Sequence, residues 1–133
     1  MSVFVSWFAS GGWVMWPLLG GGLLGNALGL AAVAAAFATP HRGVARALGV
    51  AALAGALLTL GIGGAATLHG LHAVAEAVAL VDPSMQAALR EVGTAEAYTP
   101  LEMGIASALL PLVLGFTAAA RAWPAGPPGT APR

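Results

Sequence analysis

The chain has 133 residues, of which 59% are hydrophobic and only 8% are charged. Five arginines balance five acidic residues, so the chain lacks the basic face that nucleic-acid binding requires. A soluble domain needs more charge to cover its surface, and the absence of cysteine excludes disulfides and thiolate metal sites. The composition therefore predicts an all-α integral membrane protein.

Three stretches are apolar and long enough to cross a bilayer as helices. Crossing a hydrocarbon layer of roughly 30 Å takes about 20 residues, because a helix rises about 1.5 Å per residue. The sequence predicts spans at about 13–37, 48–68 and 98–120. We expect residues 1–122 to form the membrane domain. The remaining residues, 123–133, are rich in proline and glycine and predict a disordered cytoplasmic tail.

Residues 69–97 are predicted to form the outer connection between the second and third spans. Residues 72–81 are expected to continue the second helix. The Asp-Pro-Ser sequence at 82–84 predicts a turn that caps a short helix over 85–91. The Val-Gly-Thr sequence at 92–94 is then expected to lead into the third helix.

The positions of the arginines predict the orientation in the membrane. The first loop carries Arg42 and Arg46, and the tail opens with Arg121, whereas residues 72–99 hold one arginine and four acids. Because short cytoplasmic loops collect arginine and lysine, we expect the N-terminus outside and the C-terminus in the cytoplasm. The composition, which lacks lysine and is rich in alanine, glycine and arginine, suggests a GC-rich bacterial genome.

Small residues spaced four apart predict close packing of helices. Gly21, Gly25 and Gly29 follow one another in the first span, and Gly70 follows Ala66 at the end of the second. Such faces contact helices of the same chain or of another chain, and the spacing leaves both alternatives open. Because three helices bury little surface, we expect a homo-oligomer in the lipid bilayer.

Two acids of the third span are candidates for a proton path. An ionised acid within a membrane is costly and usually faces a cavity or a partner, which makes Glu102 informative. The alternative places Glu102 in the headgroup zone, because Arg121 lies 19 residues further on, roughly 28 Å along a helix. Glu96 is nearer the outside still. Pro100 lies between the two acids and can kink the helix.

Three further polar residues mark the outer end of the second span, namely Thr67, His69 and His72. Histidine titrates near neutral pH, so the two histidines are candidates for pH sensitivity. Two histidines spaced three apart, with no third ligand at a suitable spacing, do not predict a metal site. We find no motif for catalysis or for a cofactor and expect no enzymatic activity.

Two passages carry a resemblance to a known family. The first is Gly-Gly-Trp-Val-Met-Trp-Pro-Leu-Leu at 11–19. The second runs from Ala-Thr-Leu-His-Gly-Leu at 66–71, through Asp-Pro at 82–83, to Gly-Thr-Ala-Glu-Ala at 93–97 and Gly-Ile at 104–105. In their order and spacing, and in the expected topology, these passages resemble the MotA/TolQ/ExbB proton-channel family of inner-membrane stators.

The resemblance implies a stator-like subunit of an ExbB/TolQ-type proton channel. Such a subunit forms a ring, here a pentamer, whose second and third helices surround a single-span ExbD/TolR-like partner and couple proton flow to work. Thr67 would match the family's pore-facing threonine and Glu96 the acid of its third helix, whereas Glu102 has no equivalent there. The family's large cytoplasmic segment is replaced by the short loop around Arg42. The alternative is a non-conducting structural or accessory subunit of a membrane complex.

Overall fold

The protein is an all-helical membrane protein in the computed structural model, which describes residues 5, 11–38 and 42–123. A short 3-10 helix, η1 (Gly12–Val14), leads into α2 (Met15–Ala38), which is followed by α3 (Arg42–Ala79) and α4 (Pro83–Arg121). All three long helices have the length and composition to cross a membrane, which confirms the expected fold class. Of the disordered tail expected at 123–133, Trp123 is described and follows α4, and residues 124–133 lie outside the described part of the chain.

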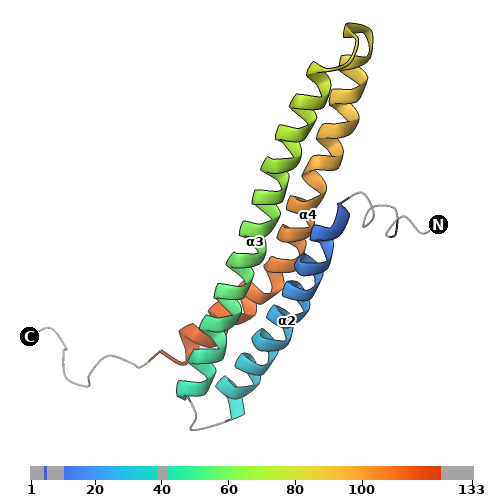
Figure 1. Cartoon of the computed structure of the whole chain (residues 1–133). Helices are drawn as coiled ribbons and strands as arrows, with labels where there is room; N and C mark the ends of the chain where they lie inside the picture. The colour runs from blue at the N-terminus through green and yellow to red at the C-terminus, as the bar shows by residue number, and fades with distance from the viewer. Residues whose placement is uncertain (1–4, 6–10, 39–41, 124–133) are drawn as a thin grey trace, which may run out of the picture.

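The helices α3 and α4 form an antiparallel hairpin that is much longer than α2 (Figure 1). They contain 38 and 39 residues, which corresponds to about 57 Å each. The start of α2 packs partway along this hairpin, where Met15 and Leu18 form an apolar cluster with Met103 and Ile62. Beyond η1, the hairpin projects by roughly 20 Å.

The projecting part of the hairpin is helical almost to its tip; the continuation of α3 to Ala79 agrees with the expected outer connection, and the α4 side differs from it. Instead of a separate helix over 85–91 and a lead-in at 92–94, α4 runs unbroken from Pro83. Because Gly93 has no Cβ, α4 can stay packed against α3 here. A Cβ at this position would lie 2.8 Å from a methyl group of Val74. The two helices therefore pack closely even at this height. The turn is confined to residues 80–82, and Asp82 takes the N-cap position without a side-chain cap bond.

The buried positions recur three and four residues apart along α2, along most of α3, and along α4 from Gly104 on. This period of about 3.5 residues is that of left-handed coiled coils. Most of the buried residues are Gly, Ala or Thr, so the backbones approach closely. The buried set in α2 is Met15, Leu18, Gly22, Gly25, Gly29 and Ala32, and the set in α3 that faces the bundle is Ala45, Gly49, Ala52, Ala56, Thr59, Gly63 and Thr67.

Large apolar side chains point away from the bundle along all three helices. Leu23 in α2, Leu57 in α3 and Phe116 in α4 are each more than 60% exposed. Such an arrangement suits lipid, which is as apolar as leucine and gives the helices no hydrophobic drive to bury these side chains against one another.

Candidate functional site

A groove of about 770 Å³ opens where the start of α2 meets the hairpin, and we call it the hairpin groove. Gly12 and Trp13 line one wall, His69 belongs to α3, and Glu96 belongs to α4. Gly12 has a φ of +67°, a conformation that glycine adopts without strain. The chain can therefore turn at Gly12 into η1 and then into α2.

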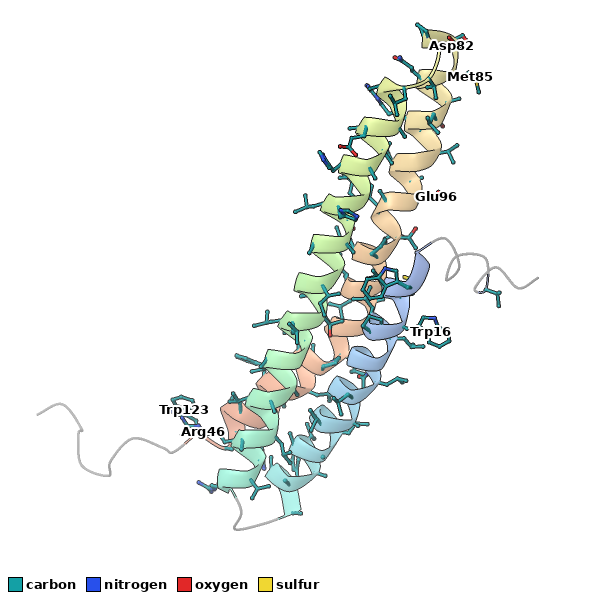
Figure 2. The ribbon with its side chains drawn as sticks, in the orientation of Figure 1. Trp16, Arg46, Asp82, Met85, Glu96 and Trp123 are labelled. Atoms are coloured by element: carbon teal, nitrogen blue, oxygen red, sulfur yellow. The ribbon has the colours of Figure 1, made fainter. Side chains whose placement is uncertain are left out.

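The hairpin groove is apolar apart from two titratable side chains. Its floor is closed by α3 and α4 themselves, because a Cβ on Gly70 would lie 3.1 Å from the Cβ of Ala97. His69 and Glu96 stand on the two helices that border this floor, and both side chains are exposed. Figure 2 shows Glu96 on α4, just beyond the start of α2. The two titratable side chains are therefore not covered by the chain itself.

Thr67 is buried between helices of its own chain. It is only 4% exposed, and its hydroxyl has no hydrogen-bond partner within the described residues. Gly63 meets Pro100 and Gly104, and Gly70 meets Ala97, so Thr67 lies opposite Pro100, about one helical turn further into the bundle than Glu96. The resemblance implies a threonine that faces a pore, whereas here this hydroxyl is covered by the chain itself.

Glu102 is not among the residues that line the hairpin groove. Its carboxylate-bearing side chain is exposed, while the next residue, Met103, packs against Met15 at the start of α2. Six residues, or about 9 Å along α4, separate it from Glu96. Of the three expected proton-path residues, only Glu96 lines the groove.

The two histidines have different surroundings. His69 lines the hairpin groove. His72 lies on the projecting part of the hairpin, where its Nε2 is 3.3 Å from Oε1 of Glu76 and both side chains are largely exposed. Within the ranges that the structure describes, no three His, Asp or Glu side chains come together as metal ligands would.

The glycines expected to pack helices all lie at contacts within the chain. A Cβ on Gly21 would meet Thr59 at 2.7 Å, and one on Gly29 would meet Leu114 at 2.9 Å. Gly25 lies against Pro111 in the same way, at 3.0 Å. Together with Gly70, these residues already hold one chain's bundle together. They therefore give no argument for a second copy.

At the opposite end of the bundle, two arginines lie on aromatic rings. The guanidinium carbon of Arg46 is 4.1 Å from the ring centre of Trp123, and that of Arg121 is 4.2 Å from the ring centre of Phe37. Figure 2 shows Arg46 and Trp123 side by side at this end. In the sequence analysis, these arginines predicted only the orientation of the chain in the membrane. Their pairing with aromatic rings depends on the register between helices and was not predicted. A sequence signal for it is that aromatic residues, Phe37 and Trp123, lie at the ends of two spans.

The geometry thus offers three features: the hairpin groove, the projecting hairpin and the paired arginines at the other end. No family model, no curated protein and no solved structure matches the chain.

Proposed function

We propose that this chain is a non-catalytic accessory subunit of a membrane complex, which anchors a projecting helical hairpin in the bilayer. The observation that carries this proposal is the composition of the spans. In the described residues, α2 has no ionisable side chain, α3 has none between Arg46 and His69, and α4 has none between Glu102 and Arg121. The last interval alone is roughly 28 Å long. Proton relays in membranes use chains of acids and histidines, and one chain alone provides none here.

The projecting hairpin is the part of the chain that suits contact with another protein. Its tip exposes Leu80 and Met85, which are 87% and 62% accessible. Figure 2 shows Met85 and Asp82 at this tip, far from Arg46 and Trp123. A protein partner bound at the tip would cover both side chains, Leu80 and Met85, and this is the contact that the proposal predicts.

Proton flux into liposomes tests the proposal directly. The purified chain is reconstituted alone and together with any single-span protein encoded beside it, and internal acidification is followed after a pH step. We expect flux at the level of empty liposomes in both cases, with an uncoupler as the control that the vesicles are intact. Flux that appears with the wild-type chain and disappears with Glu96→Gln would contradict a purely structural role.

The second candidate is the stator-like subunit of an ExbB/TolQ-type channel in the bacterial inner membrane. One observation favours it: two titratable side chains, His69 and Glu96, both line the open hairpin groove. A single-span partner with an Asp in its span would add the titratable group that the inner part of the bundle lacks. This candidate predicts flux only with the partner present, and loss of that flux in Glu96→Gln.

A further inference from the structure

Three arginines gather at the end of the bundle opposite the hairpin, and we call this region the arginine end. Arg42 opens α3, Arg46 follows one turn later, and Arg121 closes α4. A Cβ on Gly49, one turn beyond Arg46, would lie 3.1 Å from the backbone nitrogen of Ala119. This close contact places Arg46 and Arg121 at the same end of adjacent helices.

No acidic side chain lies near the arginine end. All five acids of the chain belong to the described residues, and the nearest along α4 is Glu102, roughly 28 Å from Arg121. Charges interact through water only over about 10 Å at 0.1 M salt. Arg42 and Arg46 also stand four residues apart on one helix, where like charges repel. The region therefore carries a positive charge that the acids of the chain do not neutralise.

Two of the three guanidinium groups are held in place by aromatic rings. Arg46 of α3 lies over Trp123, which follows α4, and Arg121 of α4 lies over Phe37 of α2. A guanidinium that stacks on a ring through its face keeps the N–H groups of its edge available. Those edges match the geometry of phosphate oxygens. The two pairs also link all three helices, so the donors are positioned before a ligand arrives.

We propose that the arginine end binds the phosphate headgroup of an anionic membrane lipid, such as phosphatidylglycerol. A lipid fits better than a soluble phosphate because apolar side chains beside the arginines remain accessible to acyl chains. Phe37 is 65% exposed, Val44 52% and Trp123 60%. Tryptophan and arginine at the end of a span are also the residues that sit at a membrane interface. The lipid site does not depend on the proposed function, because it uses none of the groove or hairpin residues.

Lipid titration of the full-length chain in neutral detergent tests this site. Bound lipids are counted by native mass spectrometry, and the melting midpoint is followed in parallel. We expect phosphatidylglycerol to remain bound and to raise the midpoint, and phosphatidylcholine to do neither. Each arginine near an anionic membrane surface contributes about fivefold to affinity, so Arg46→Gln with Arg121→Gln should weaken binding about 25-fold.

Arg90→Gln is the matched control, because Arg90 is an exposed arginine on the projecting hairpin. It should bind phosphatidylglycerol as the wild type does. Equal binding by the double variant and by Arg90→Gln would refute the site. Equal stabilisation by inorganic phosphate would refute the lipid as the ligand. If the double variant fails to fold by circular dichroism, Arg42→Gln, which lies outside both aromatic pairs, should still show a fivefold loss, and no loss would overturn the proposal.

Lysine variants test whether the stacked guanidinium itself matters. Arg46→Lys with Arg121→Lys keeps both charges but removes the planar fork that binds two phosphate oxygens. We expect affinity between those of the wild type and the glutamine variant. Affinity equal to that of the wild type would overturn the role of the aromatic-held guanidinium groups.

Discussion

Gly63 and Gly64 are consecutive residues of α3, and only one of them lies against another helix. A Cβ on Gly63 would be 2.7 Å from the carbonyl oxygen of Pro100 and 3.3 Å from the Cα of Gly104. A Cβ on Gly64 would meet no atom within 4 Å. The atoms facing Gly63 belong to a backbone, which cannot rotate away as a flexible side chain does. Single glycines therefore set the distance between α3 and α4.

Replacing these two glycines with alanine separates packing from helix propensity. Alanine favours a helix over glycine by about 1 kcal/mol at either position. At Gly63 the added methyl group overpacks the α3–α4 contact, which typically costs about 1–3 kcal/mol. In mixed micelles, we expect Gly63→Ala to unfold at a lower denaturant fraction than Gly64→Ala. The denaturant fraction that unfolds Gly64→Ala should equal or exceed that of the wild type. Equal stability of the two variants would mean that the helices do not approach as closely as described.

At the scale of the elements, hydropathy predicted the three spans but not where their helices end. The expected second and third spans, 48–68 and 98–120, are only parts of α3 and α4. Hydropathy measures transfer into lipid, whereas a helix continues beyond the lipid wherever packing supports it. Gly70 against Ala97 and Gly93 against Val74 supply that packing.

The sequence predicted individual candidate residues of the site, but not how these residues are arranged relative to one another. Thr67, His69 and Glu96 were all singled out, yet the sequence did not predict that only two of them share a groove. Whether a side chain faces a groove or a neighbouring helix depends on the rotation and register of two helices. Those follow from many small contacts, such as Gly63 against Pro100, that no single residue indicates.

Cysteine labelling tests whether the hairpin lies outside the bilayer. The chain contains no cysteine, so one introduced thiol reports on one place. Met85 at the tip and Leu57 in mid-α3 are each 62% exposed in the isolated chain, and only Leu57 should be covered by lipid. A membrane-impermeant maleimide should label Met85→Cys in intact spheroplasts and leave Leu57→Cys unreacted. After denaturation in detergent both thiols should react. Labelling of Met85→Cys only in inverted vesicles would reverse the expected orientation.

At the scale of the whole molecule, the two ends differ in charge and in shape. The arginine end carries Arg42, Arg46 and Arg121, and the long hairpin at the other end carries most of the acids (Figure 1). Between them lies a bundle whose small residues already pack within one chain. Any ring of identical subunits must therefore use the outward faces of the helices.

The outward face of α3 is where we expect a second copy to bind, if the stator-like arrangement holds. Gly61 is exposed there, and a Cβ on it would meet nothing within 4 Å in the single chain. Gly20 on α2 is exposed and open in the same way, but the first helix would face lipid in such a ring. Native mass spectrometry in mild detergent should then show a discrete homo-oligomer for the wild type and for Gly20→Leu. Gly61→Leu should shift it to monomer with unchanged helix content. A wild-type chain that is only monomeric would rule out the ring and leave the accessory role.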